Sequence, residues 1–248
     1  MPAPVVQEIE VPLTRGGRRP GVLALPEAAG PRPGVVVLHD ILGLTADTRR
    51  HCRRFAEAGY AALAPDLYDD RRPRCVVSTV MAMVRERGPA HGIVADARRA
   101  LAARPEVDEG RIGITGFCMG GGFALLAAAD DAYAVAAPFY GSVPRSAARL
   151  RGACPTLAQY GALDASFVGH ARRLARHLEA LGVPHEVLVH PGVGHSFMND
   201  HPGSKLFALG ARLPMHAAYD PETERRAWAR LLTFFDDHMP AAAKGASR

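Results

Sequence analysis

The stretch RIGITGFCMGGG, residues 111–122, decides the fold of this chain. Apolar and β-branched residues lead into a Gly-x-Cys-x-Gly turn centred on Cys118, and a helical stretch follows at residues 123–129. This is the layout of a nucleophile elbow, a sharp strand-to-helix turn that exposes one reactive side chain above a sheet. Glycine suits both flanks, because a Cβ at Gly116 or Gly120 would collide with the tightly turned backbone. The pattern predicts a hydrolase with a thiol nucleophile.

Two later loops carry the other residues that a catalytic triad needs. Triads built on such an elbow run in the order nucleophile, acid, histidine. Asp164 lies in a loop after the apolar run at residues 155–158, and His195 lies in a Gly-rich turn after the strand-like residues 187–190. Cys118, Asp164 and His195 are therefore a candidate triad in the expected order.

Each member of the triad has an alternative interpretation. Cys118 could be a small buried hydrophobic residue, which is common for free cysteine. Asp164 could be the N-cap of the amphipathic segment 167–180, although Ser166 could also fill that position.

Two other histidines lie near His195 in sequence. His190 falls inside or at the end of a strand, which favours a structural role, and His201 lies further along the same region. His195, between a glycine and a serine in a turn, is the better candidate for the base.

Composition limits the class of protein. With 248 residues and 48% hydrophobic residues, the chain can bury a sizeable core. No window approaches 18 consecutive apolar residues and the first ten residues do not resemble a secretory signal, so we expect no membrane span. Four cysteines without Cys-x-x-Cys spacing favour a reducing cytoplasm.

Charge and motif spacing exclude several ligands. The net charge is +5, but the arginines occur in small groups mixed with acids, without aromatic interleaving, so we expect no nucleic-acid partner. The elbow lacks the Gly-x-Gly-x-x-Gly and Gly-Lys-Ser/Thr spacings of phosphate-binding loops. Eleven histidines show no His-Glu-x-x-His pattern, so no metal or other cofactor is expected.

Strand-like and helical segments alternate along the chain. Strands are predicted at residues 5–13, 21–25, 34–39, 60–65, 111–117, 134–140, 155–158 and 187–190, and helices at 45–58, 76–87, 93–103, 123–129, 167–180 and 222–237. The first two strands form a hairpin, and the rest predict a mainly parallel α/β sheet with helices on both faces. We expect one domain at residues 1–238 without a large cap domain, and a disordered tail at 239–248.

Four motifs carry a resemblance to a known family. They are HDILGL at residues 39–44, PDLY at 65–68, GFCMGG at 116–121 and GHSF at 194–197. The chain resembles the dienelactone hydrolases (carboxymethylenebutenolidases), cysteine members of the α/β-hydrolase superfamily, from about residue 5 to the last helix. The resemblance implies the α/β-hydrolase fold and carries the family's triad onto Cys118, Asp164 and His195.

The resemblance also implies a catalytic role for Asp40. The family usually has glutamate at this position, where the carboxylate contacts the resting thiol and takes its proton when substrate binds. Aspartate is one methylene shorter, and a turn-forming Asx residue at a strand end is the alternative. The family holds its substrate carboxylate with arginines, one of them four residues beyond the catalytic histidine, where this chain has Asn199.

These residue types fit acyl transfer. The Cys118 sulfur would attack an ester or lactone carbonyl, His195 would shuttle the proton, and Asp164 would hold the imidazole. On this fold the oxyanion donors are the backbone amides of Met119 and Ile41. The positive N-terminus of the following helix favours a thiolate. A thioester intermediate suits enol-lactones and activated esters.

Alternatives for substrate and function stay open. Tyr68, Phe197 and Asn199 are candidate substrate-binding residues, although core packing explains aromatic residues at strand ends equally well. We expect a small ester or lactone substrate and a monomer or small homo-oligomer. The competing functions are a broad carboxylesterase for substrates without a carboxylate, favoured by Asn199, and a non-catalytic protein that binds or senses a small molecule.

Overall fold

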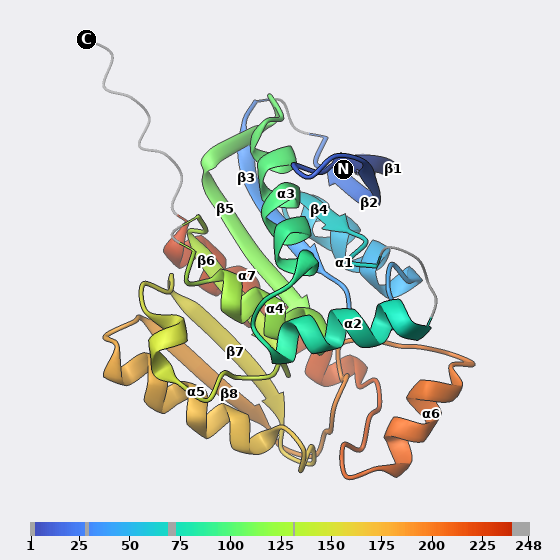
Figure 1. Ribbon diagram of the computed structural model, residues 1–248, viewed down its shortest axis with the longest axis vertical. Coiled ribbons are helices and arrows are strands. Elements are labelled where there is room, and N and C mark those ends of the chain that lie inside the picture. Colours follow the sequence, from blue (N-terminus) through green and yellow to red (C-terminus); the bar gives the residue numbers. More distant parts are fainter. Residues whose placement is uncertain (1–2, 28–29, 69–72, 131, 240–248) are drawn as a thin grey trace.

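One eight-stranded sheet organises the part of the chain that the structure describes. The computed structural model describes residues 3–27, 30–68, 73–130 and 132–239 (Figure 1). The strands are β1 (Val5–Pro12), β2 (Arg18–Leu25), β3 (Arg32–Leu38), β4 (Ala61–Pro65), β5 (Val107–Phe117), β6 (Val135–Phe139), β7 (Thr156–Gly161) and β8 (His185–His190). Their order across the sheet is β1-β2-β4-β3-β5-β6-β7-β8.

The most deeply buried strands lie in the parallel part of the sheet. From β4 to β8 all neighbours pair in parallel, whereas β1, β2 and β4 pair antiparallel. Every residue of β4, β6 and β7 is buried, as a parallel sheet covered on both faces requires. The predicted mainly parallel sheet and opening hairpin are both confirmed.

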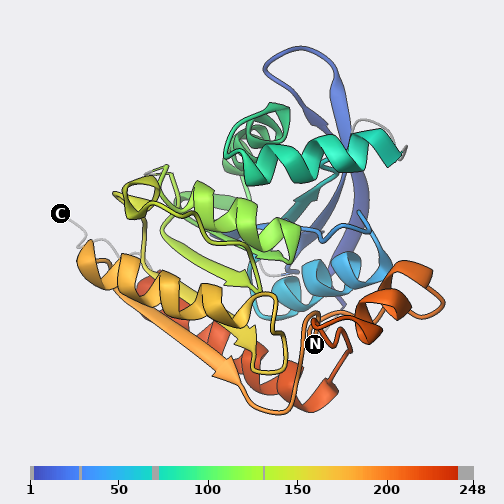
Figure 2. The same ribbon diagram turned by 60° about the horizontal axis from the view of Figure 1, so that its bottom comes forward.

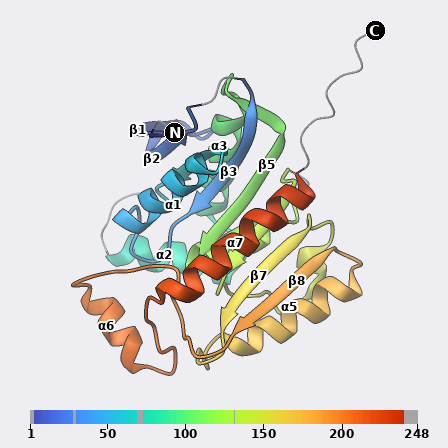
Figure 3. The same ribbon diagram turned by 180° about the vertical axis from the view of Figure 1, so that it is seen from behind.

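Helices cover both faces of this sheet. They are α1 (Ala46–Glu57), α2 (Pro73–Val84), α3 (Pro89–Ala102), α4 (Met119–Ala127), α5 (Val168–Ala180), α6 (Lys205–Arg212) and α7 (Pro221–His238), with a 3₁₀ turn at Ala147–Leu150. α2 to α5 lie on the face toward the viewer in Figure 1, and α1 and α7 lie on the opposite face, shown in Figure 3. The ring centroids of Phe55 in α1 and Trp228 in α7 are 4.6 Å apart, so these two helices share one apolar layer.

The strand order places a crevice at the carboxyl ends of β3 and β5. The chain leaves β3 toward β4 and returns on the other side of β3 as β5, so the connections diverge between these two strands. Ligands of open α/β sheets bind at such switch points. Asp40 follows β3 and Cys118 follows β5, so both lie at this crevice.

Several element bounds differ from the sequence-based expectation, among them the start of β5 at Val107 instead of residue 111, and two differences bear on the site. α4 begins at Met119, directly after the elbow cysteine, rather than at residue 123. α6 was not predicted, because it has only eight residues and none of them is buried. It begins where the Ser204 hydroxyl accepts a hydrogen bond of 3.2 Å from the Phe207 amide. α6 lies at the edge of the molecule that Figure 2 turns toward the viewer.

The C-terminal end of α7 is fixed to the sheet. Met239 is buried, and its carbonyl accepts a hydrogen bond from Arg111 of β5. The predicted tail otherwise lies at residues 240–248, outside the described residues. Within the described ranges, no helix has the length and apolar character needed to cross a membrane.

Candidate active site

Cys118 lies at a strained turn between β5 and α4. Its backbone angles are φ 53° and ψ −114°, outside the regions that non-glycine residues prefer. The Cys118 amide donates to the Phe139 carbonyl of β6 at 3.1 Å, and its carbonyl accepts from the Gly122 amide at 3.1 Å. Such backbone strain persists only where the surroundings hold it, and it clusters at functional sites.

Two glycines make this turn possible. A Cβ on Gly116 would lie 2.2 Å from the Gly120 carbonyl oxygen, and a Cβ on Gly120 would lie 2.4 Å from the His39 carbonyl oxygen. The predicted steric need for glycine at both positions is confirmed. The Cys118 side chain is half-buried: it packs against the edge of the hydrophobic core and also lines a cavity.

His195 and Asp164 form a buried pair at the ends of β8 and β7. The Nδ1 atom of His195 lies 2.6 Å from Oδ2 of Asp164, and both side chains are at most 2% exposed. The His195 ring contacts the rings of Tyr140 and Phe167, with centroid distances of 4.8 and 4.9 Å. These contacts fix the plane of the imidazole.

Asp164 does not cap the following helix through its side chain. α5 begins after Phe167, which makes no side-chain cap hydrogen bond. The second oxygen of Asp164, Oδ1, accepts from the Ser166 amide at 3.2 Å, which stabilises the turn that carries the carboxylate. The alternative roles of Asp164 and Ser166 as helix caps are therefore not found.

The free nitrogen of His195 meets Cys118. Nε2 is buried and makes no well-formed hydrogen bond with the described residues, so its interaction with the Cys118 thiol does not have regular hydrogen-bond geometry. Burial lowers the pKa of His195, but the charge of Cys118 and the hydrogen bond with Asp164 outweigh it and raise the pKa to about 9. The charged imidazolium form of His195 is therefore favoured beside the sulfur.

The two predicted oxyanion donors lie next to this pair. Met119 is the first residue of α4, so its amide has no acceptor within the helix. Ile41 lines the cavity together with Cys118. The Tyr68 hydroxyl donates to the Ile41 carbonyl at 2.8 Å and lies 3.8 Å from Sδ of Met119, so one buried side chain contacts both residues.

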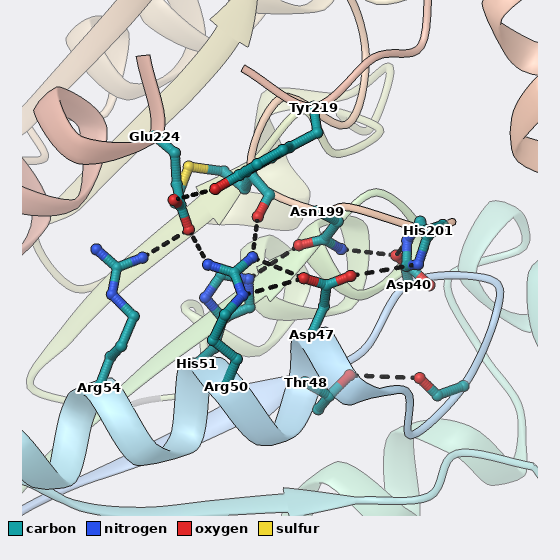
Figure 4. Close-up of polar contacts among 12 residues, drawn as sticks. Asp40, Asp47, Thr48, Arg50, His51, Arg54, Asn199, His201, Tyr219 and Glu224 are labelled. Carbon is teal, nitrogen blue, oxygen red and sulfur yellow. Dashed lines mark hydrogen bonds and ion pairs between the residues drawn. The ribbon is translucent and has the colours of Figure 1, made fainter. Parts of the chain in front are cut away.

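Asp40 binds the neighbouring loop instead of the thiol. Oδ1 accepts from the Leu42 amide at 2.8 Å, whereas Oδ2 accepts from Asn199 at 2.6 Å and lies 2.7 Å from Nε2 of His201 (Figure 4). Burial raises the pKa of Asp40, but these donors outweigh it and lower the pKa. No hydrogen bond to Cys118 is found among the described residues, so the contact implied by the family resemblance is not formed in this structure.

A cluster of charged side chains extends from Asp40 to α7. Nδ1 of His201 lies 3.4 Å from Oδ2 of Asp47, whose other oxygen accepts from Arg50 at 2.6 Å. Arg50 also binds Glu224, and Arg54 lies 2.6 Å from the same carboxylate (Figure 4). The cluster joins the loop after β3, helix α1, the segment before α6, and α7.

The three predicted substrate-binding side chains lie behind the cavity. Tyr68, Phe197 and Asn199 are 4%, 0% and 3% exposed, and none of them lines the cavity wall. Asn199 accepts from Nε2 of His51 at 2.9 Å, and burial lowers the pKa of His51 to about 3, so that ring is a neutral donor. Phe197 packs on Tyr140 at 5.2 Å. These side chains position the loops of the site.

The cavity itself has a volume of about 220 Å³. It is lined by Asp40, Ile41, Leu42, Cys118, His195, Ser196 and His201, and by Leu206, Phe207, Leu209, Gly210, Leu213, Met215 and Ala217 from α6 and the loop after it. Across the part of the chain that the structure describes, no group of three His, Cys, Asp or Glu side chains could hold a metal ion.

Sequence patterns missed the second half of this site. Asp47, His51 and His201 are spread over α1 and a loop about 150 residues away, and no motif spacing links them. One sequence pattern could have predicted α6: Ser204 is followed by apolar residues at helical spacing up to residue 213. That signal is weak in so short a segment.

Comparisons with known proteins find relatives along most of this chain. Residues 20–239 match the dienelactone hydrolase family. A protein of Escherichia coli O157:H7, provisionally named a carboxymethylenebutenolidase, is 30% identical and covers 91% of this chain and 84% of its own length. A protein of Yersinia pestis with the same provisional name is 28% identical over 92% of this chain and 87% of its own length. The crystal structure of a dienelactone hydrolase-like promiscuous phosphotriesterase from metagenomic libraries is 28% identical, covers 96% of this chain and 99% of its own, and has a TM-score of 0.82.

The His201–Asp40 pair gives a prediction about stability. Burial lowers the pKa of His201, but the hydrogen bond with Asp40 and the charges of Asp40 and Asp47 outweigh it and raise the pKa. A raised histidine pKa stabilises the fold fully below the unfolded pKa of about 6.5, and the effect is lost as pH rises through the folded pKa. We expect His201→Gln to lower the free energy of unfolding by about 2 kcal/mol at a pH of about 6, and by clearly less in alkaline buffer.

Urea unfolding at the two pH values measures this difference. In an Asp40→Asn background the same His201 substitution should lose most of its pH dependence, because the main partner of the imidazolium is gone. A stability loss that is equal at both pH values, or larger at high pH, would contradict the ion pair.

Proposed function

The chain belongs to the dienelactone hydrolase family, and from this premise we propose that it hydrolyses enol-lactones or activated esters through a thioester formed on Cys118. One observation carries the proposal. The half-buried Cys118 side chain lines a cavity beside His195, whose other ring nitrogen is bound to Asp164 at 2.6 Å. Covalent hydrolases use this arrangement of a nucleophile, a base and a third group that orients the base.

In the first half-reaction a carbon–sulfur bond forms and a carbon–oxygen bond breaks. The Cys118 thiolate attacks the carbonyl carbon, and the carbonyl oxygen takes the negative charge. When that tetrahedral adduct collapses, the ester oxygen leaves and takes a proton from the His195 imidazolium. Asp164 keeps the ring in the tautomer that presents Nε2 to the reaction.

In the second half-reaction water cleaves the thioester. Nε2 of His195, now neutral, accepts a proton from the attacking water, and the carbon–sulfur bond breaks as the acid is released. Cys118 leaves as a thiolate next to the imidazolium, which restores the starting pair.

The amides of Ile41 and Met119 are proposed to bind the oxyanion. Removing one such donor typically costs about 3 kcal/mol of transition-state stabilisation. Asp40 then acts as a positioning residue, because its carboxylate fixes the Leu42 amide next to Ile41 and ties that loop to Asn199 and His201.

Thiol chemistry narrows the range of substrates. Thiolate is a good leaving group, so the tetrahedral adduct of an ester with a poor alkoxide leaving group returns to reactants. Enol-lactones and activated esters release a stabilised oxygen and go forward. A broad carboxylesterase for substrates without a carboxylate remains the second candidate, since no lysine or arginine is among the described residues that line the cavity.

Replacing the sulfur tests the mechanism. We expect Cys118→Ala to lower the turnover of p-nitrophenyl acetate by about 10³-fold or more, because the covalent route is lost. The matched control is Cys154→Ala, since burial raises the pKa of that thiol to about 12 and it does not line the cavity. Turnover that persists in Cys118→Ala would refute a thiol nucleophile.

Stoichiometric iodoacetamide labelling of Cys118 without any ester turnover would instead support the non-catalytic binding protein. Labelling by mass spectrometry and turnover are therefore measured on the same preparation.

The pH profile tests the role of His195. Because the pKa of His195 is raised to about 9, the imidazolium that protonates the leaving oxygen should be lost above that pH. We expect kcat/KM for an enol ester to fall on an alkaline limb near pH 9, while p-nitrophenyl esters, whose leaving group needs no proton, fall less. Asp164→Asn should move this limb to lower pH, because it removes a group that raises the pKa. A limb that does not move would contradict the assignment.

A further inference from the structure

Helix α6 presents an apolar face to the active site instead of to the core. Leu206, Leu209 and Leu213 are 49%, 54% and 43% exposed. Leu206 and Leu209 lie three residues apart on one side of the helix, and Leu213 directly follows its last residue. Large exposed apolar side chains are normal singly, but three that line the same cavity are typical of a ligand-binding surface.

This face is continuous with the catalytic cavity. The same three leucines line the cavity that also contains Cys118 and His195. Phe207 of α6, and Ile41 and Leu42 of the loop after β3, complete the apolar wall. When a substrate carbonyl lies at the Cys118 sulfur, the group attached to that carbonyl therefore contacts these leucines.

Charge on the cavity wall does not favour an anion. Asp40 contributes a carboxylate whose pKa is lowered. His201 lines the cavity, but Asp40 lies 2.7 Å from one of its ring nitrogens and Asp47 lies 3.4 Å from the other. Apart from His195, which belongs to the proposed triad, the described wall offers no unpaired cationic side chain to a substrate carboxylate. Burying a carboxylate there would leave its desolvation uncompensated.

We propose that α6 makes this protein selective for uncharged esters or lactones that carry an aliphatic chain, and that the chain lies along Leu206, Leu209 and Leu213. The inference rests on the proposed function and adds the substrate class to it. In this inference the protein recognises its substrate by burying an apolar chain, and not by binding a substrate carboxylate.

Two series of neutral esters measure this selectivity. p-Nitrophenyl alkanoates lengthen the acyl side, and alkyl thioacetates lengthen the leaving side. Burial of one methylene is worth about 0.8 kcal/mol, so kcat/KM should rise about fourfold per methylene in at least one series until the cavity is filled. A carboxylate at the far end of a chain of equal length should lower kcat/KM by at least about tenfold.

Substitutions on α6 locate the effect. Leu209→Ser should flatten the dependence on chain length, because it replaces an apolar contact by a hydroxyl on an exposed position where folding is not at risk. Ala208→Ser is the matched control, since Ala208 is exposed on the same helix and does not line the cavity, and it should keep the wild-type dependence.

A binding measurement separates this inference from the proposed mechanism. Aliphatic amides and their carboxylate-terminated analogues, titrated by calorimetry into Cys118→Ala protein, report the preference of the cavity without turnover. Tighter binding of the longer neutral amides, weakened by Leu209→Ser, supports the inference even if no ester is hydrolysed. The inference would be overturned if kcat/KM did not depend on chain length, or if the carboxylate-terminated ester were used as well as the neutral one or better. It would also be overturned if the dependence on chain length were unchanged in Leu209→Ser. None of these results would contradict a thiol-dependent hydrolase.

Discussion

The site depends on one close backbone contact, where the start of α4 packs against the end of β3. The distance leaves no room for a Cβ at Gly120, and a second contact of the same kind excludes a side chain at Gly116. Between these glycines the chain must turn sharply, which forces Cys118 to a φ of 53°. The same contact brings the sulfur next to the loop that carries Ile41, so the nucleophile and a proposed oxyanion donor are positioned together.

A carboxylate joins the two sides of the cavity. Asp40 holds its own loop through the Leu42 amide and holds the segment before α6 through Asn199 and His201. Where the family resemblance implies a carboxylate that reaches the thiol, this chain has a shorter side chain whose oxygens bind other donors. The position of α6, and with it the apolar wall of the cavity, therefore depends on the same group that orders the proposed oxyanion loop.

The sequence predicted the local features well and the long-range contacts poorly. The elbow, the order of the triad and the strand–helix alternation follow from short motifs and periodicity, and the family and fold are confirmed. The burial of Tyr68, Phe197 and Asn199 could not be predicted, because a residue in a loop after a strand has the same sequence pattern whether it is buried or lines a cavity. The contact of His201 with Asp40 spans 161 residues, and no spacing rule encodes it.

The central claim is that an acyl group is carried by the Cys118 sulfur during turnover. Acid quenching during the first turnover of an activated ester, followed by peptide mass spectrometry, tests this claim directly. We predict an adduct with the mass of the acyl group on the peptide that contains Cys118, removed by neutral hydroxylamine as expected for a thioester. Acylation of a different residue, or rapid turnover without an adduct on Cys118, would contradict the account.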